Sequence, residues 1–239
     1  MTFNLKYKPY GNQVILIEWP ARIEESILED IINFKQKIKN DNKYHVQDLI
    51  IAYNSLTIKY HYPFKDFKKQ MVQLKNSYLS LTTRVVTESI TWHIPVCYNL
   101  EFGLDLKGLA KEKNLSITTL IDRHSNPFYK VYFIGFLPGF LYLGGLDKTL
   151  HCNRKIVPRF NITKGSVGIG GNQTGIYPSD SAGGWNIIGR TPISFFNASL
   201  DKPCFAKSGD NIKFRPIDKI EFLEIENKIA RGTFTLKQN

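Results

Sequence analysis

Polar side chains that could bind an anion lie among glycines in the second half of the chain. Arg159 and Arg190 carry planar guanidinium groups, which match the geometry of carboxylates and phosphates. Gln173 and Thr174 follow soon after Gly171, whose missing side chain allows a ligand to approach the backbone closely. These residues are candidates for substrate binding. Each has a structural alternative, because polar and charged side chains in loops also brace the backbone by hydrogen bonds.

His124 is the candidate for acid–base chemistry. An imidazole titrates near neutral pH and can accept and return a proton during a reaction. A histidine at the C-terminal end of a helix is also stabilised by the helix dipole, and His124 ends a short predicted helix, so a structural role is the alternative. His93 lies within an apolar run, where we expect a structural histidine.

The glycines indicate where the chain turns tightly or contacts a ligand. Twelve of the 17 glycines fall between Gly135 and Gly189. Large apolar residues such as Phe140, Tyr177 and Trp185 are interleaved with them, which flexible linkers lack. The segment is therefore predicted to be folded and rich in turns.

Three common motifs are not matched in this segment or elsewhere. The glycines of 168–171 resemble a dinucleotide fingerprint, but the fingerprint requires a helix directly afterwards, and Thr174–Pro178 follow here. The chain has no G-x-x-x-x-G-K-[ST] phosphate loop and no G-x-S-x-G nucleophile elbow. We therefore expect no cofactor bound by this chain.

Composition and charge limit the classes of protein to which the chain can belong. The 239 residues carry a net charge of +11, which could serve a nucleic acid, an acidic membrane or an acidic protein partner. The basic residues are dispersed and no nucleic-acid motif accompanies them, so a solvated lysine-rich surface is predicted instead. We expect neither nucleic acid nor membrane among the partners.

The cysteines and the N-terminus indicate the compartment. Cys97, Cys152 and Cys204 are odd in number and far apart, which argues against a disulfide framework or a metal site. The N-terminus has no apolar core of a signal peptide, and no apolar run has the length of a membrane span. The sequence therefore predicts a cytoplasmic protein.

The elements of the first half predict a small α+β domain over residues 1–88. Strands are expected at 4–7, 14–19 and 56–62, with a shorter apolar segment at 48–53. Helices are expected at 23–40 and 64–81 from apolar residues at helical spacing. A further apolar run at 90–98 gives an order that fits a ferredoxin-like split βαβ unit.

The second half, residues 89–239, predicts a barrel or sandwich. Two short helices at 105–113 and 116–124, the second with Ser116 as N-cap, precede a strand at 128–136. Brief apolar runs cut by Gly, Pro and Asn follow, and a final helix is expected from 217 to 230.

Two blocks of sequence resemble those of a known family. The first is IGFLPGFLYLGGLD at 134–147, and the second runs from Gly165 to Pro192 and includes GNQTGIYP and GGWNIIGRTP. Both are similar to the 5-oxoprolinase B subunit family, also called allophanate hydrolase subunit 1 and the sporulation-kinase inhibitor family. Between the blocks, Cys152-Asn153 and Ile162-Thr163-Lys164 depart from the family pattern, whereas Arg154, Pro158 and Arg159 match it.

The resemblance implies an α+β architecture, with a ferredoxin-like N-terminal domain and a cyclophilin-like β-barrel. It also implies a B subunit that acts with A and C subunits in an ATP-dependent 5-oxoprolinase, which opens 5-oxoproline (pyroglutamate) to glutamate. The ATP is used by the assembled complex. In that setting His124 and Arg190 are the expected catalytic residues, while Gln173, Thr174, Arg159 and Gly171 are expected to bind the substrate.

Two other functions are open on the same resemblance. One is a binding module that inhibits a sensor histidine kinase, and the other is a subunit that acts on urea-derived amides such as allophanate.

The first motif block also predicts a contact surface for a partner subunit. Phe136, Phe140 and Tyr142 flank Pro138-Gly139 in an expected surface loop. We therefore expect these aromatic residues to form an exposed interface. Separately, we expect Gly171, Gln173 and Arg190 to line one groove of the barrel.

Overall fold

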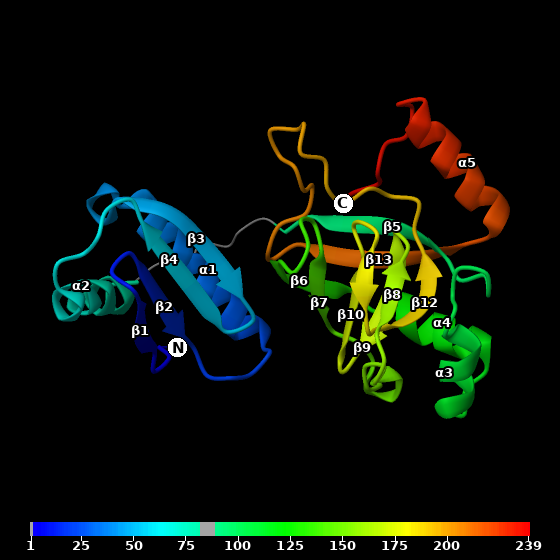
Figure 1. Ribbon diagram of the computed structural model, residues 1–239, viewed down its shortest axis with the longest axis horizontal. Helices are drawn as coiled ribbons and strands as arrows, with labels where there is room; N and C mark the ends of the chain where they lie inside the picture. Colours follow the sequence, from blue (N-terminus) through cyan, green and yellow to red (C-terminus); the bar gives the residue numbers. More distant parts are fainter. Residues whose placement is uncertain (1, 82–88) are drawn as a thin grey trace. The chain divides into compact units, whose positions relative to one another are not determined.

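A computed structural model describes residues 2–81 and 89–239 of the chain (Figure 1). The chain divides into two compact units, Met1–Glu88 and Ser89–Asn239. Together they make a mixed α+β protein in which one unit is built on an open sheet and the other on a closed barrel. Each unit is described by itself below.

Unit 1 is a four-stranded antiparallel sheet with two helices. Its strands have the spatial order β1-β2-β4-β3. The elements are β1 (Lys6–Tyr10), β2 (Val14–Glu18), α1 (Glu25–Asn40), the 3-10 turn η1 (Asn42–Tyr44), β3 (Val46–Ala52), β4 (Ser55–Tyr60) and α2 (Phe67–Leu79). Helix α1 packs on β3 and β4, and α2 packs beside α1.

Alternating apolar residues explain this sheet. Ile15 and Ile17 of β2 lie opposite Ile58 and Leu56 of β4, and all four side chains are buried. Strand alternation places them on one face, where they meet the apolar stripe of α1. The predicted helices and the strand at 56–62 are confirmed within a few residues at their ends.

A buried carboxylate ties the two helices of unit 1 to the sheet. Asp30 on α1 accepts hydrogen bonds from Trp19 Nε1 at 2.7 Å and from the Tyr78 hydroxyl of α2 at 2.6 Å. Burial, together with the bond to Asp30, raises the pKa of Tyr78, so its hydroxyl stays a donor. Buried polar groups of this kind require partners, and here the two partners come from the residue that follows β2 and from α2.

Unit 2 is built on a closed barrel of seven strands with the order β10-β7-β6-β13-β5-β12-β9. The barrel strands are β5 (Thr91–Cys97), β6 (Tyr129–Ile134), β7 (Leu141–Gly144), β9 (Ser166–Gly170), β10 (Gln173–Ile176), β12 (Asn186–Arg190) and β13 (Asn211–Ile217). A separate ribbon pairs β8 (Arg159–Ile162) with β11 (Ser181–Gly183). Barrel closure satisfies the strand edges that an open sheet leaves exposed.

Helices and a short turn complete unit 2. They are α3 (Leu106–Glu112), α4 (Ile117–Ser125), η2 (Lys148–Leu150) and α5 (Lys219–Ala230). Helix α3 contacts β12, α4 contacts β13, and α5 contacts β5. Ser116 caps α4 as predicted, because its hydroxyl accepts a hydrogen bond from the Thr119 amide at 3.0 Å.

The structure corrects one feature of the expected topology. The apolar run at 90–98 was expected to fit the split βαβ pattern of the first unit, but β5 pairs with β13 and β12 in the barrel. Its pairing with β13 is parallel over all seven residues, and β12 pairs with its other edge at Arg190 and Cys97, so the barrel takes both edges of this strand. Strand β1 instead forms an edge of the first sheet, next to β2.

The described residues also bear on the cysteines and on membrane spans. Cys97, Cys152 and Cys204 are all free thiols. Across 2–81 and 89–239, no helix has both the length and the apolar character to span a bilayer.

Candidate functional site

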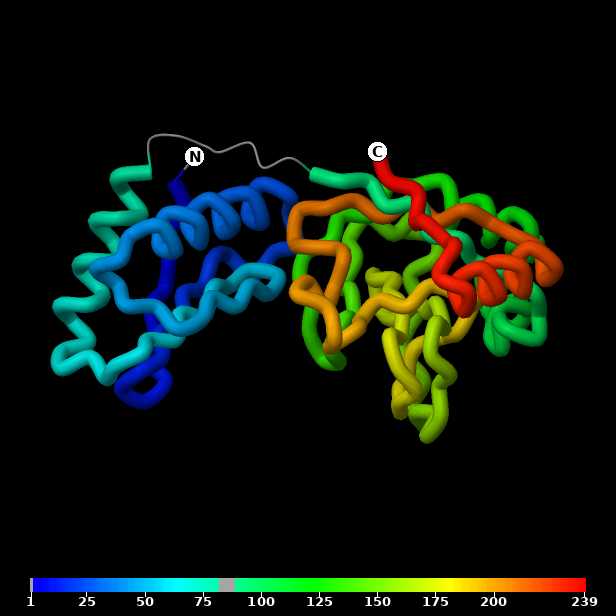
Figure 2. The backbone as a smooth tube through the Cα atoms, turned by 90° about the horizontal axis from the view of Figure 1, so that it is seen from above, coloured from blue at the N-terminus to red at the C-terminus, as the bar shows by residue number. Residues whose placement is uncertain are grey.

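The two motif blocks meet at one small cavity of about 280 Å³ in unit 2, which we call the aromatic pocket. It is lined by Phe136, Phe140, Tyr142, Arg154, Pro158, Tyr177, Ala182, Gly183, Gly184 and Trp185. The loop between β6 and β7 supplies the first phenylalanines, and the chain around β11 supplies the glycines. Figure 2 shows the yellow-green and yellow chain around β8 and β11 extending away from the rest of unit 2. The blocks are thus joined in space although the 17 residues of 148–164 separate them along the chain.

Phe140 is the centre of the pocket's aromatic wall. Its ring makes edge contacts with Tyr177 at 5.4 Å, with Trp185 at 5.5 Å and with Phe136 at 5.6 Å between ring centroids. Such edge-to-face pairs are favourable because a ring edge is positive and a ring face negative. Phe140 is only 2% exposed, so the expectation that it lies on an exposed interface is wrong.

Close backbone approach explains glycines in the second block. A Cβ at Gly170 would lie 2.6 Å from the Trp185 indole, which real side chains do not tolerate. The strand β9 therefore packs directly against the indole, and this contact requires glycine at position 170. At Gly183 an added Cβ would overlap the Tyr177 hydroxyl. The glycines thus shape the pocket wall.

Phe136 and Tyr142, the other expected interface residues, differ from Phe140. Phe136 is 65% exposed and has a φ of +67°, in the left-handed region that residues other than glycine rarely adopt. Backbone of this kind costs about 1–3 kcal/mol and occurs often at functional sites. Tyr142 is half-buried and stacks on Phe133 at 4.1 Å between centroids. Burial raises the pKa of Tyr142, and Arg154 opposes this rise.

An apolar surface adjoins the aromatic pocket. Ile156 is fully exposed, Val157 is 74% exposed and Phe160 is 93% exposed, while Pro158 between them lines the pocket. Together with Phe136 they make the set that we call the apolar rim: Phe136, Ile156, Val157 and Phe160. Contiguous exposed apolar residues usually mark a contact surface. Sequence reasoning missed positions 156, 157 and 160, although IVPRF is visibly apolar.

Asp105, a residue that sequence reasoning did not select, holds this region in place. Its carboxylate receives both guanidinium nitrogens of Arg159 at 2.7 and 2.8 Å, the Lys155 ammonium at 2.7 Å and the Ile187 amide at 2.7 Å. Burial favours the neutral acid, but these donors outweigh it and hold the pKa of Asp105 below its usual value. No local pattern could have revealed it, because Arg159 lies 54 positions further along.

This ion pair decides the role of Arg159. Each of its terminal nitrogens donates to Asp105, which supports the structural alternative for Arg159. The amide of Lys155 also donates to the Gly184 carbonyl at 2.7 Å. The segment that carries Arg154 is thereby held against the pocket.

His124 lies in the barrel core and is fully buried. Its Nδ1 lies 2.8 Å from the Tyr98 hydroxyl, and its Nε2 lies 2.9 Å from Thr174 Oγ1. Thr174 Oγ1 donates its own proton to the Gly168 carbonyl at 3.0 Å, so His124 Nε2 must be the protonated nitrogen that donates to Thr174. Nδ1 then accepts from Tyr98, and both nitrogens are occupied.

Burial lowers the pKa of His124 to about 3. Its ring also stacks on Phe214 at 4.7 Å between centroids. A neutral, enclosed imidazole with two occupied nitrogens fits the structural alternative, and Thr174 is equally enclosed. Neither residue lines the aromatic pocket.

Arg190, Gln173 and Gly171 do not share the groove expected of them. Arg190 lies opposite Ser166 at one end of β9, whereas Gln173 lies opposite Gly170 at the other end. Arg190 donates from Nε to the Lys164 carbonyl at 3.0 Å and lines a separate cavity of about 200 Å³. Gly171 begins the turn between β9 and β10 and lines a third cavity, of about 230 Å³. The single-groove expectation is wrong, because strand pairing places these residues at opposite ends.

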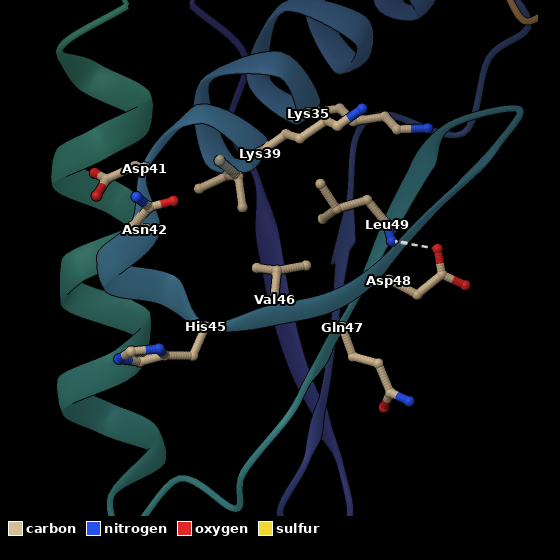
Figure 3. A pocket seen from close by; sticks show the side chains of 10 residues that line it. Lys35, Lys39, Asp41, Asn42, His45, Val46, Gln47, Asp48 and Leu49 are labelled. Carbon is tan, nitrogen blue, oxygen red and sulfur yellow. Dashed lines mark hydrogen bonds between the residues drawn. The ribbon is translucent and has the colours of Figure 1, made fainter.

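Unit 1 contains a larger cavity of about 510 Å³ (Figure 3). Lys35 and Lys39 of α1 lie on one side of it, and residues 45–49, from His45 into the edge strand β3, lie along the other. Burial lowers the pKa of Lys35, and Asp48 accepts a hydrogen bond from the Leu49 amide at 2.7 Å. The cavity contains no residue of the motif blocks, so the aromatic pocket is the stronger candidate site.

Comparisons with known proteins define the class. Residues 5–206 match the family described as carboxyltransferase domain, subdomain C and D. The sequence is 33% identical to the 5-oxoprolinase B subunit of Bacillus subtilis (strain 168), over 93% of this chain and 97% of that protein. It is 37% identical to the 5-oxoprolinase B subunit of Haemophilus influenzae, over 82% of this chain and 89% of that protein.

One solved structure shows the same fold in a larger protein. The K. lactis urea amidolyase superposes with a TM-score of 0.82 at 17% identity, covering all of this chain and 16% of that chain. This likeness concerns the fold alone. The chain belongs to the carboxyltransferase C and D domain family and, within it, to the 5-oxoprolinase B subunit family.

The buried imidazole should make stability depend on pH. Folding depresses the pKa of His124 below the value of about 6.5 for an unfolded histidine, so the unfolded chain binds a proton that the folded chain does not. Stability is therefore present above pH 6.5 and is lost as the pH falls. Between pH 7 and pH 5 we expect a loss of about 2 kcal/mol in the free energy of unfolding from this residue.

Urea unfolding at several pH values measures this loss. His124→Gln keeps two hydrogen-bonding atoms and should flatten the pH dependence, while His61→Gln, at an exposed histidine, should leave it unchanged. An imidazolium NMR signal from His124 in the folded protein at pH 6 would contradict the assignment.

Removing the carboxylate of Asp105 should loosen the pocket. Asp105→Ala leaves Arg159 and Lys155 without their anion, and we expect the free energy of unfolding to fall by about 2–4 kcal/mol. Hydrogen exchange should accelerate across 155–162. The control is Glu221→Ala, which breaks an exposed pair with Arg215 and should cost below about 1 kcal/mol. Equal losses for the two variants would show that Asp105 has no special role.

Proposed function

We propose that this chain is the B subunit of an ATP-dependent 5-oxoprolinase, acting with A and C subunits. The observation that carries the proposal is the match along nearly the whole length of the 5-oxoprolinase B subunit from Bacillus subtilis. The convergence of both motif blocks on the aromatic pocket supports it, because the most characteristic residues then share one cavity. ATP enters through the assembled complex, and the proposal places that complex in the cytoplasm.

The chemistry explains why several subunits are needed. A lactam carbonyl is a poor electrophile, and transfer of the terminal phosphoryl group of ATP to its oxygen makes the ring carbon open to attack. One water then opens the ring by breaking the carbon–nitrogen bond, and a second water releases the phosphate, giving glutamate, ADP and phosphate. This chain has no phosphate loop, which fits phosphorylation by the A subunit. The present protein would act with the C subunit on the activated intermediate.

We also propose which known folds the two units adopt. Read from β2 onward, unit 1 follows the order β-α-β-β-α, and β1 occupies the edge position that the last strand of a ferredoxin-like fold would take. We assign it as a permuted ferredoxin-like domain, and the barrel of unit 2 as cyclophilin-like.

The apolar rim supplies a surface for the C subunit. Phe160 and Ile156 are almost completely exposed, and burying such side chains in an interface gains about 25 cal/mol per Å² of apolar area. Phe136, which lines the aromatic pocket, is also largely exposed. Docking there would cover the aromatic pocket and exclude water from the reacting centre.

The activity test uses the three purified subunits. We expect ATP-dependent conversion of 5-oxoproline to glutamate from the complete mixture, and none from this chain alone. Allophanate replaces 5-oxoproline in a parallel assay. Turnover of 5-oxoproline by the isolated chain would refute the subunit role, and turnover of allophanate in place of 5-oxoproline would refute the substrate.

A variant of the apolar rim tests the interface. Phe160→Asp should leave the isolated chain folded, because position 160 is exposed, and should raise the dissociation constant for the C subunit about 10–100-fold. Isothermal titration calorimetry measures this constant. Ile220→Asp, at an exposed isoleucine on α5, is the matched control and should bind normally. Equal affinity for both variants would place the C subunit elsewhere.

A further inference from the structure

The arginines around the motif blocks differ in what they bind. Arg159 gives both terminal nitrogens to Asp105, and Arg190 gives its Nε to the Lys164 carbonyl. Within residues 2–81 and 89–239, Arg154 has neither a carboxylate nor a carbonyl as a hydrogen-bond partner. Its contact is with the ring of Trp185, whose centroid lies 5.6 Å from the guanidinium carbon.

That contact leaves the donors of Arg154 available. A cation over an indole is attracted by the negative ring face and gives no N–H group to an acceptor. The five donors of a guanidinium are arranged as a fork that matches a carboxylate with two parallel bonds. Arg154 lines the aromatic pocket, so an acceptor that enters the pocket can receive this fork.

The charge around the pocket favours an anion. The described residues that line it include no aspartate and no glutamate. The carboxylate of Asp105, which binds the segment next to Arg154, is already paired with Arg159 and Lys155. Arg154 therefore contributes a positive charge that the pocket itself does not balance.

The walls favour a small flat ring. Phe140, Trp185 and Tyr177 present aromatic surfaces, and the cavity of about 280 Å³ lies just below the roughly 300–1,000 Å³ of sites for drug-sized ligands. A ring of a few atoms can lie against these walls while a carboxylate attached to it meets the guanidinium.

We propose that the aromatic pocket is the substrate carboxylate subsite, in which Arg154 binds the carboxylate of 5-oxoproline and the aromatic walls hold its lactam ring. This inference rests on the proposed function and adds the group that distinguishes 5-oxoproline from neutral amides. Such a site selects a ring amide that bears a carboxylate, and it binds the same ring without the carboxylate weakly, because the guanidinium then has no partner. Arg154 is a binding residue here and takes no part in proton transfer.

Binding and turnover together test the subsite. Binding to the complex of this chain with the C subunit is followed by tryptophan fluorescence, since Trp185 lies in the pocket, and the probes are 5-oxoproline and 2-pyrrolidinone, the same lactam without a carboxylate. For Arg154→Gln we expect the dissociation constant and the KM for 5-oxoproline to rise by about 10–100-fold, with little change in kcat. Binding of 2-pyrrolidinone should be weak in the wild type and unchanged in the variant. Arg154→Lys keeps the charge without the fork, so its dissociation constant for 5-oxoproline should lie between those of the wild type and Arg154→Gln.

Arg215→Gln is the matched control, because Arg215 pairs with Glu221 on the surface, and its KM should equal that of the wild type. The melting temperature of each variant shows that it is folded. A normal KM for Arg154→Gln in an active complex overturns the subsite and leaves the proposed function intact. A wild-type complex without 5-oxoproline turnover overturns the proposed function. The fluorescence titration then decides the subsite separately: binding that is saturable and lost in Arg154→Gln upholds it, and absence of binding overturns it.

Discussion

The contact between Asp105 and Arg159 is the constraint on which the candidate site depends. The carboxylate joins the start of α3, the β8 ribbon and the strand β12, three segments that no local interaction would bring together. The Asp105 amide also donates to the Ile187 carbonyl at 2.7 Å, so main chain and side chain clamp the same residue. Trp185 and Arg154 lie close in sequence to Ile187 and Lys155, which Asp105 binds. The contacts of Asp105 therefore also hold Trp185 and Arg154 in position. A nearly buried carboxylate with four donors has few alternative arrangements.

A second polar group, His124, lies inside the barrel and organises its core. Tyr98, His124 and Thr174 form a chain of hydrogen bonds that ends on the Gly168 carbonyl, linking α4 to β9 and β10. A buried imidazole is costly unless both nitrogens have partners, and here both do. The histidine therefore stabilises the barrel core. The low pKa keeps the imidazole neutral, which fits a structural role for His124.

The apolar side chains around the aromatic pocket fall into a buried group and an exposed group. Phe140 and Trp185 are buried in the pocket wall, whereas Ile156 and Phe160 are exposed beside it. A chain that functioned alone would be less prone to aggregate if these exposed side chains were buried or replaced. The proposed complex accounts for both the buried and the exposed side chains, because a partner that covers the apolar rim would enclose the aromatic pocket. The pocket would then supply substrate recognition, while activation by ATP takes place elsewhere in the assembly.

The sequence by itself determined the elements, the family and the region of the site. Helical and alternating apolar spacing located α1, α2, α4 and α5, since these patterns depend only on neighbours along the chain. The glycine-rich blocks indicated the close packing that Gly170 and Gly183 allow against Trp185 and Tyr177.

Only the tertiary structure decided which polar residues are free to act. His124, Arg159 and Arg190 have the residue types of a catalytic site. Partners distant in sequence bind both nitrogens of His124 and both terminal nitrogens of Arg159, whereas Arg190 gives only its Nε to such a partner. Phe140 follows a turn like a surface residue, yet it is enclosed by rings from the second block. Burial and hydrogen bonding depend on contacts across the fold, and residue type and spacing carry no record of those contacts.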